Sequence, residues 1–217
     1  MPLIDIHTHS PNPFATISVV DATGATELPR REGIVYSAGI HPCFIAPNHR
    51  EQAATISALA ASGQIAAIGE CGFDRTSSVP IDIQAEVFSA LARLSAERAM
   101  PMIIHCVHGA DRLLQFRKFM PFIGAWVIHG FRGKPAAMGQ LVEAGFSISF
   151  GARANAESVK LCPGNRIFLE TDTAPHSALQ QIYQNYSALR GEDLETVAAE
   201  NYRRLFSQTL HQESPET

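Results

Sequence analysis

The sequence has no apolar run long enough to cross a membrane, since none approaches the roughly 18 consecutive apolar residues of a spanning helix. Its first residues carry neither a basic segment nor a clean apolar segment, so we expect no secretory signal. Charged residues are few, at 18% of the chain, and the formal net charge is −4. This balance excludes a broad electrostatic grip on nucleic acid, and no membrane partner is expected.

Several catalytic motifs are missing as well. The chain contains no P-loop, no Gly-x-Gly-x-x-Gly fingerprint, no nucleophile elbow and no Cys-x-x-Cys pair. Nucleotide-triphosphate, acyl-enzyme and redox chemistries therefore have no support. The cysteines show no paired or metal-type spacing, so we expect them to be reduced thiols of a cytoplasmic protein; they are Cys43, Cys71, Cys106 and Cys162.

The chain does contain the material of a globular protein. It has 217 residues, of which 46% are hydrophobic, enough for a sizeable core. Domains average about 150 residues, but single α/β barrels are often longer. We therefore expect one domain over residues 1–210 and a disordered polar tail at residues 211–217.

Short apolar runs alternate with longer amphipathic segments along the whole chain. Runs of this length, bounded by Gly, Pro or polar residues, are typical of strands buried on both faces. They occur at residues 3–6, 17–20, 34–38, 65–68, 102–104, 125–128, 146–149 and 167–169. Helical periodicity is found at residues 51–62, 84–99, 111–119, 135–144, 175–189 and 194–210.

Eight strands with mostly helical crossovers predict a parallel α/β protein, and eight is the number that closes a TIM-type (β/α)8 barrel. An open doubly wound sheet would also fit this alternation. Residues 10–33 are too few, and too rich in Pro, Gly and Thr, for a crossover helix. We therefore expect the barrel to be irregular between its first and third strands.

Residues of metal-binding types follow the predicted strands, always at the same end. Because the carboxyl ends of barrel strands face the active site, these residues should converge there. His7 and His9 lie two apart in an extended segment, so both rings project to one side, as suits a divalent ion. The predicted metal ligands are His7, His9, Glu70, His105, His129 and Asp172.

Two carboxylates of this set are the candidate catalytic residues. Glu70 can bridge two cations, as in two-metal hydrolases, and no lysine follows a predicted strand to do so instead. Asp172 lies beyond the last strand, where a carboxylate can bind metal and take a proton from bound water. Taken alone, each carboxylate of the predicted ligand set would be interpreted as a turn residue, and each histidine as a structural residue. Their shared position after the predicted strands favours metal binding.

Further residues near the predicted strand ends are candidates for substrate binding. His41 contacts either substrate or a further ion, or it is structural. Asp74 is placed to orient a metal-bound histidine through its free ring nitrogen. Two arginines are placed to meet phosphates unless they are merely solvated charges. The predicted substrate-binding residues are His41, Asp74, Arg132 and Arg153, and Glu170 ranks second to Asp172 as a site carboxylate.

Together, these motifs resemble the TatD-like metal-dependent hydrolases, a branch of the amidohydrolase superfamily. The similarity spans nearly the whole chain, with the pieces in the family order. The matching pieces are Asp5-Ile6-His7-Thr8-His9, Gly39-Ile40-His41-Pro42, Ile68-Gly69-Glu70-Cys71-Gly72-Phe73-Asp74, Pro101-Met102-Ile103-Ile104-His105, His129-Gly130-Phe131 and Arg166-Ile167-Phe168-Leu169-Glu170-Thr171-Asp172-Thr173-Ala174-Pro175.

The resemblance implies a TIM-barrel hydrolase with a binuclear divalent site, often acting as a DNase. By matching position, one ion would be held by His7, His9, Glu70 and Asp172, and the other by Glu70, His105 and His129. Zinc, manganese, nickel and iron suit such mixed ligands, and magnesium suits them less. The chain departs from the family at Val107, where an arginine is usual, in a reduced loop after Pro175, and in a short segment between His9 and His41.

The leading interpretation is a metal-dependent phosphodiesterase, an exonuclease-like deoxyribonuclease that acts on DNA ends and favours single strands. One alternative is hydrolysis of a small ester, amide or phosphoester. The other is a metal-binding component of a larger defence or repair assembly, against which the intact ligand set argues. A nuclease assay with added metal separates the first two interpretations.

Overall fold

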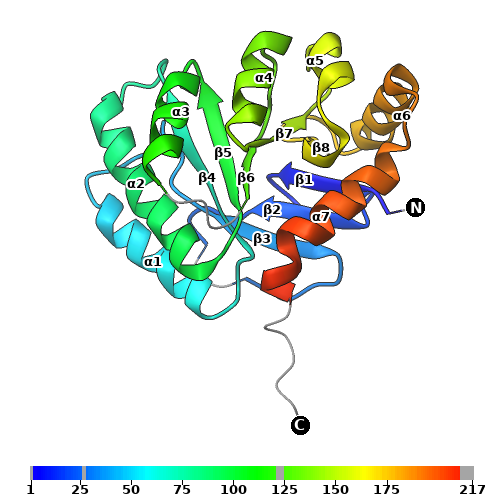
Figure 1. Ribbon diagram of the computed structural model, residues 1–217. Coiled ribbons are helices and arrows are strands. Elements are labelled where there is room, and N and C mark those ends of the chain that lie inside the picture. The colour runs from blue at the N-terminus through cyan, green and yellow to red at the C-terminus, as the bar shows by residue number, and fades with distance from the viewer. Residues whose placement is uncertain (1, 26–27, 121–124, 211–217) are drawn as a thin grey trace.

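The computed structural model describes residues 2–25, 28–120 and 125–210, so the tail predicted at 211–217 lies outside the described residues. Eight parallel strands pair in chain order in one sheet (Figure 1). They are β1 (Ile4–Thr8), β2 (Ile17–Asp21), β3 (Ile34–Ala38), β4 (Ala67–Asp74), β5 (Met102–Val107), β6 (Trp126–Ile128), β7 (Ser147–Phe150) and β8 (Ile167–Leu169).

The two outermost strands of this sheet meet at their carboxyl ends. A parallel bridge joins Thr8 at the end of β1 to Asp172 just after β8. There the backbone N–H of Asp172 donates to the carbonyl of His7 at 3.0 Å. The sheet is therefore a nearly closed barrel, and the predicted TIM-type fold is confirmed.

Seven α-helices lie among the described residues, and six of them were predicted. They are α1 (His49–Ala61), α2 (Ile81–Arg98), α3 (Ala110–Phe119), α4 (Pro135–Glu143), α5 (Ala156–Leu161), α6 (Ala178–Arg190) and α7 (Leu194–Leu210). The helix that was not predicted, α5, has only six residues, too few to show an amphipathic period. Between β1 and β3 the described residues contain no helix, which confirms the predicted irregularity.

Strands β4 and β5 extend beyond the apolar runs that predicted them. Glu70 and His105 were expected after strands, but both lie within them. Pairing continues through polar positions, with Gly72 opposite His105 and Asp74 opposite Val107. The predicted strands ended with the apolar runs, at Ile68 and at Ile104. Here His105 lies within hydrogen-bonding distance of Glu70 and of Asp74 across the two strands, so the polarity does not mark a strand end.

Buried apolar side chains form a large cluster and a smaller one. The smaller one joins Ile4 of β1, Ile103 of β5 and Phe168 of β8 to Tyr202 and Phe206 of α7. Helix α7 therefore packs against strands from both ends of the sheet and helps to hold the barrel together (Figure 1).

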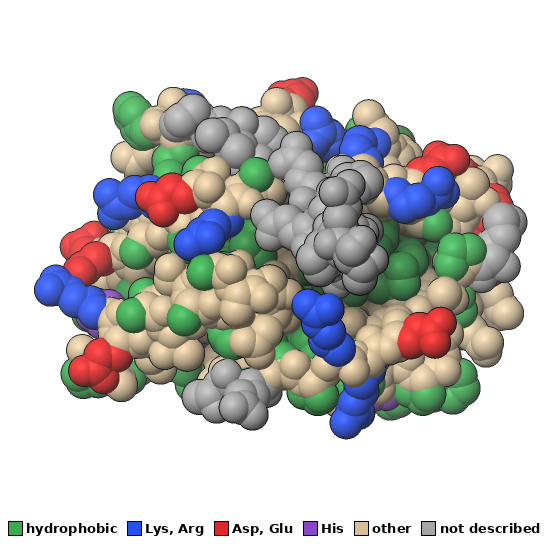
Figure 2. Space-filling model, turned by 90° about the horizontal axis from the view of Figure 1, so that it is seen from below, with side chains coloured by type: hydrophobic (Ala, Val, Ile, Leu, Met, Phe, Trp, Pro, Cys, Tyr) green, Lys and Arg blue, Asp and Glu red, His purple; other side chains and the backbone are tan. Residues whose placement is uncertain are grey.

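The surface view in Figure 2 shows the barrel from the side of the chain's C-terminus. On this face Lys and Arg side chains lie among Asp and Glu, and charges of one sign do not gather. Among the described residues, no helix is both long enough and apolar enough to span a bilayer. The low charge of the sequence thus appears on this face as a mixed surface without a broad basic patch.

Candidate metal centre

Side chains from six strands (β1, β3, β4, β5, β6 and β8), or from the short segments after them, converge inside the carboxyl end of the barrel. The structure brings all six predicted metal ligands together and adds His41. Neighbouring ring centroids lie 4.2 Å apart for His7 and His129, and 4.4 Å apart for His41 and His105. Three overlapping groups have ligand atoms close enough to hold a cation: His7 with Glu70 and His129, His7 with His9 and Asp172, and His41 with Glu70 and His105.

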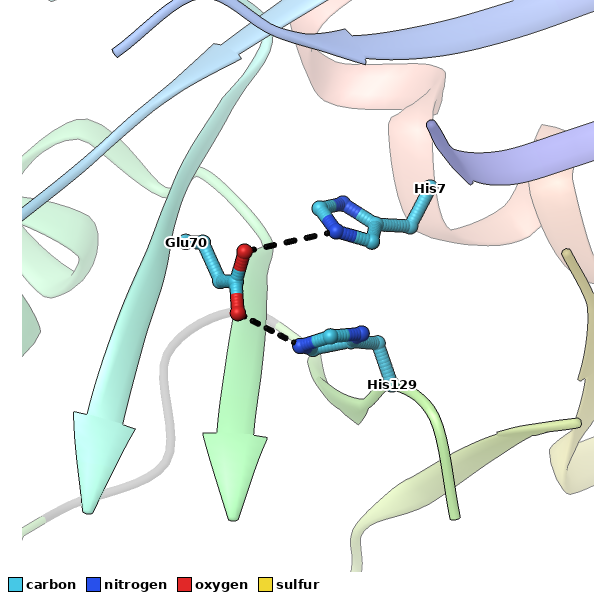
Figure 3. A group of neighbouring side chains, drawn as sticks. All are labelled: His7, Glu70 and His129. Carbon is cyan, nitrogen blue, oxygen red and sulfur yellow. Dashed lines mark hydrogen bonds and ion pairs between the residues drawn. The ribbon is translucent and has the colours of Figure 1, made fainter. Parts of the chain in front are cut away.

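Glu70 lies at the centre of this cluster. Its Oε1 is 2.8 Å from His105 Nδ1 and 2.8 Å from His129 Nε2. Its Oε2 is 3.4 Å from His7 Nε2. Figure 3 shows His7 and His129 approaching different oxygens of the carboxylate. A single carboxylate thus faces histidines of separate strands with its two oxygens, as a bridging ligand requires.

The two site carboxylates are held ionised by their neighbours. Burial by itself would raise the pKa of Glu70, but hydrogen bonds from His105 and His129 outweigh burial and lower that pKa far below its ordinary value. Burial also acts to raise the pKa of Asp172, and the hydrogen bond from His9 reverses this and lowers it. Both groups therefore carry the negative charge that a divalent cation needs.

The backbone places Asp172 directly beside the β1 histidines. Its Oδ1 is 3.4 Å from His9 Nε2 and 3.8 Å from His7 Nε2. Asp172 has a φ of 53°, in the left-handed region that aspartate and asparagine occupy more readily than most residues. This conformation turns the chain back after β8 while its N–H bonds to His7, so the carboxylate stays close to both rings.

Unsatisfied ring nitrogens of His7 leave room for a cation among the candidate ligands. Neither Nδ1 nor Nε2 of His7 has a hydrogen-bond partner, although the side chain is fully buried. Such an orphaned buried polar atom typically costs about 1–3 kcal/mol. A divalent cation at Nε2, beside Glu70 and Asp172, would relieve that cost. The nitrogen and oxygen donors of the cluster are those preferred by zinc, manganese, nickel and iron.

Three of the histidines have a carboxylate behind the ring nitrogen that points away from the cluster. This arrangement fixes the ring orientation of metal-binding histidines and leaves the other nitrogen free as a ligand. The pairs are His105 Nε2 with Asp74 Oδ2 at 3.0 Å, His9 Nδ1 with Asp21 Oδ2 at 3.6 Å, and His129 Nδ1 with Glu170 Oε1 at 3.7 Å.

His41 differs from these three histidines, because a backbone N–H and not a carboxylate contacts its outer ring nitrogen. Its Nδ1 accepts a hydrogen bond from the backbone N–H of Cys43 at 3.1 Å, so this nitrogen carries no proton. The proton of the neutral ring must then lie on Nε2, which is 3.3 Å from Glu70 Oε1. Nε2 is therefore a hydrogen-bond donor into the site, whereas a ligand would need its lone pair there.

The remaining predicted site residues lie around the cluster. Asp74 is close to His105, and hydrogen bonds from Thr76 and His105 overcome the effect of burial and hold the pKa of Asp74 at about 2. Arg132 and Arg153 line a pocket of about 320 Å³ that also includes Asp172. The structure thus places Asp74 behind a histidine and the two arginines beside the open edge of the cluster.

Sequence reasoning missed Asp21 and ranked Glu170 second. Asp21 directly follows the apolar run at residues 17–20, the same strand-end position that identified the candidate metal ligands. The strand-end position of Asp21 was therefore visible in the sequence. Glu170 accepts a hydrogen bond from the backbone N–H of Gly130 at 2.6 Å, so it also fixes the loop that carries His129.

A buried network ties β1 to the segment after β8, and we expect Thr171→Val to weaken it. Asp5 accepts from the hydroxyl of Thr171 at 2.6 Å, from its N–H at 2.9 Å and from Asn12 at 2.7 Å. Losing the hydroxyl should lower the free energy of unfolding in urea by about 1–3 kcal/mol. The control Thr55→Val removes an exposed hydroxyl bond on α1 and should cost at most about 0.5 kcal/mol. An equal loss of unfolding free energy in the two variants would show that the buried network stabilises the fold no more than an exposed hydroxyl bond does.

Cation binding is expected to strengthen as the pH rises from 6 to 8. Hydrogen bonds to Asp172 and Asp21 raise the pKa of His9 to about 10, and Glu170 and Glu70 raise that of His129 well above its ordinary value against the effect of burial. Both rings are therefore protonated in the metal-free protein, and a cation must displace those protons. Titration calorimetry with Mn²⁺ should show proton release and up to about tenfold tighter binding per pH unit per proton. An affinity independent of pH would contradict this.

Comparison with known proteins matches residues 13–207 to the family described as TatD related DNase. A curated relative from Erwinia billingiae, named 3'-5' ssDNA/RNA exonuclease TatD, is 34% identical over 210 residues, covering 82% of this chain and 79% of the relative. The protein of the same name from Erwinia amylovora is 33% identical, covering 78% and 77%.

Two solved structures share the fold at low sequence identity. The TatD homologue YJJV from Escherichia coli has a TM-score of 0.78 at 19% identity, covering 94% of this chain and 98% of the other. A TatD family hydrolase from Entamoeba histolytica has a TM-score of 0.74 at 15% identity, covering 100% and 99%. The likeness therefore extends over the full barrel.

Proposed function

Because this chain belongs to the TatD related DNase family, we propose that it is a divalent-metal-dependent phosphodiesterase that removes nucleotides from the ends of single-stranded DNA. The curated relatives are named for single-stranded DNA and RNA exonuclease activity. The observation that carries the proposal is the position of Glu70, whose two oxygens face histidines of different strands inside the barrel mouth.

We assign two cations to this cluster. One would be held by His7, His9, Glu70 and Asp172, and the other by Glu70, His105 and His129. When bound, the cations would neutralise the phosphate, activate a water and stabilise the leaving oxygen. The orphaned nitrogens of His7 support this assignment, as do the carboxylates behind three of the ligand rings.

The chain's own residues would bind and orient the substrate and move the proton. Asp172 is ionised and 22% exposed, so it can take a proton from a water at the open edge of the cluster. His41 would donate a hydrogen bond from Nε2 to a phosphate oxygen, because its Nδ1 is already occupied by the Cys43 N–H. Arg132 and Arg153, beside the pocket next to Asp172, would contact the backbone phosphates.

We also propose that residues 1–210 form one domain, because α7 shares a buried cluster with β1, β5 and β8. A cytoplasmic location is supported by the cysteines, which are all unpaired.

The test is hydrolysis of a single-stranded oligonucleotide labelled at its 3' or its 5' end, with Mn²⁺ or with EDTA. We expect stepwise shortening from one end that requires the metal. A parallel assay with p-nitrophenyl acetate addresses the small-ester alternative. Ester hydrolysis without DNA cleavage under any divalent metal would overturn the nuclease proposal.

A further inference from the structure

One large aromatic side chain beside the metal centre is left open to solvent. Phe44 is 74% exposed, while most large apolar side chains of the described residues are buried in the two clusters. It lies in the segment after β3, at the carboxyl end of the barrel where the ligands converge. Only Phe119 is comparably exposed among the described phenylalanines, at 78%.

The exposure of Phe44 does not come from a loose loop. Its backbone N–H donates to the carbonyl of His41 at 2.9 Å, closing a tight turn. The Ser77 hydroxyl donates to the Pro42 carbonyl at 3.1 Å, and the Cys43 thiol lies 3.5 Å from Asp74 Oδ2 at the end of β4. The turn is therefore fixed on both sides, and it presents the ring in a defined place at little entropic cost.

The side chain of His41 lies between the ring of Phe44 and the Glu70 carboxylate. The centroid of the Phe44 ring lies 5.1 Å from that of His41, with an angle of 39° between the planes. His41 Nε2 in turn lies 3.3 Å from Glu70 Oε1. A phosphate held by cations beside Glu70 would thus have its own or the next nucleotide within reach of the phenyl ring.

Few fixed positive charges are available to hold a nucleic acid here. The net charge is −4, and Arg75, near Asp74, is engaged in an ion pair with Asp111. Binding a single strand then depends more on its bases, which have an apolar face whatever the sequence. Stacking of a base on an aromatic side chain typically strengthens binding about 5- to 150-fold.

We propose that Phe44 is a stacking platform for an unpaired base of the nucleic acid whose phosphate lies at the metal centre. This inference rests on the proposed nuclease function and adds a base-binding position to it. Because stacking needs an unpaired base, Phe44 would also favour single-stranded over duplex ends. A base contact of this kind releases no counterions, so it would not change the salt dependence of binding.

The first test compares Phe44→Ala with the wild-type protein and with Phe119→Ala, which removes an equally exposed ring at the far end of α3. The substrates are a thymidine oligonucleotide and the same oligonucleotide with abasic terminal nucleotides, both with Mn²⁺. We expect Phe44→Ala to raise KM about 5- to 150-fold on the first substrate with little change in kcat. On the abasic substrate it should match wild type, and Phe119→Ala should match wild type on both.

Equal KM values for wild type and Phe44→Ala on the thymidine oligonucleotide would overturn the inference while leaving the nuclease function intact. An equal loss on the abasic substrate, or a change in the slope of log KM against log salt, would also overturn it. Absence of any oligonucleotide cleavage by wild type would instead reject the proposed function. Melting temperatures should be the same for all variants, because both phenylalanines are exposed.

The second test observes the stacking directly in Phe44→Trp. The chain has one native tryptophan, Trp126, which is 4% exposed. The introduced indole should be quenched by the oligonucleotide at the concentrations that saturate hydrolysis, whereas wild-type fluorescence should not change. KM should stay within about threefold of wild type, since an indole stacks at least as well as a phenyl ring. Saturable hydrolysis without quenching would contradict the inference.

Discussion

Glu70→Gln is expected to reduce metal-dependent hydrolysis of a single-stranded oligonucleotide by about 10³-fold or more while the protein stays folded. Glu70 is the only carboxylate among the described residues that faces His7, His41, His105 and His129 together. A neutral amide of the same shape supplies no charge to hold cations between these rings. Loss of several kcal/mol of transition-state stabilisation corresponds to this factor, at about 1.4 kcal/mol for each tenfold change.

The measurement is turnover at saturating oligonucleotide, together with metal content after dialysis. Glu97→Gln is the matched control, because it makes the same chemical change at an exposed position of α2. It should retain wild-type turnover and metal content. A folded Glu70→Gln protein with near-wild-type turnover would remove Glu70 from the role of bridging ligand.

Asp172→Asn is expected to lower kcat by about 10²- to 10⁴-fold, the range of a lost general base. Asparagine tolerates the left-handed φ of 53° at this position, so the turn after β8 should survive. The backbone bond from residue 172 to the His7 carbonyl also survives. The substitution therefore removes the charge and the proton-accepting oxygen without moving the chain.

Turnover and circular dichroism check this second expectation, with Asp82→Asn in the exposed first turn of α2 as the control. The control should keep its activity. Unchanged kcat in a folded Asp172→Asn protein would show that Asp172 does not accept the proton.

Much of the barrel and of the site could be predicted because strand-end position is visible in sequence. Apolar runs mark buried parallel strands, and a polar residue directly after each run lies at the carboxyl end. This reasoning found His7 and His129, and it would have found Asp21 had it been applied to the second strand. It could not find the full length of β4 and β5, because polar residues inside a closed barrel interrupt the apolar pattern without ending the backbone pairing.

Other features depend on contacts that no residue pattern reveals. The tautomer of His41 is set by a backbone N–H two residues on, so the sequence could not separate a ligand from a donor at this position. Phe44 is an apolar residue like many in the core, and only the tight turn after β3 places its ring outside. The short α5 has an N-cap residue that is visible in the sequence, Asn155, but its six residues are too few to show a helical period.

The most direct test of the central claim is a titration of the metal-free chain with Mn²⁺, in which bound metal and oligonucleotide hydrolysis are followed in the same samples. The cluster around Glu70 predicts no hydrolysis without metal, and a rise to full activity as two equivalents of Mn²⁺ bind each chain. Hydrolysis that persists at full rate in the metal-free protein, or that is already complete with a single bound ion, would contradict the binuclear site.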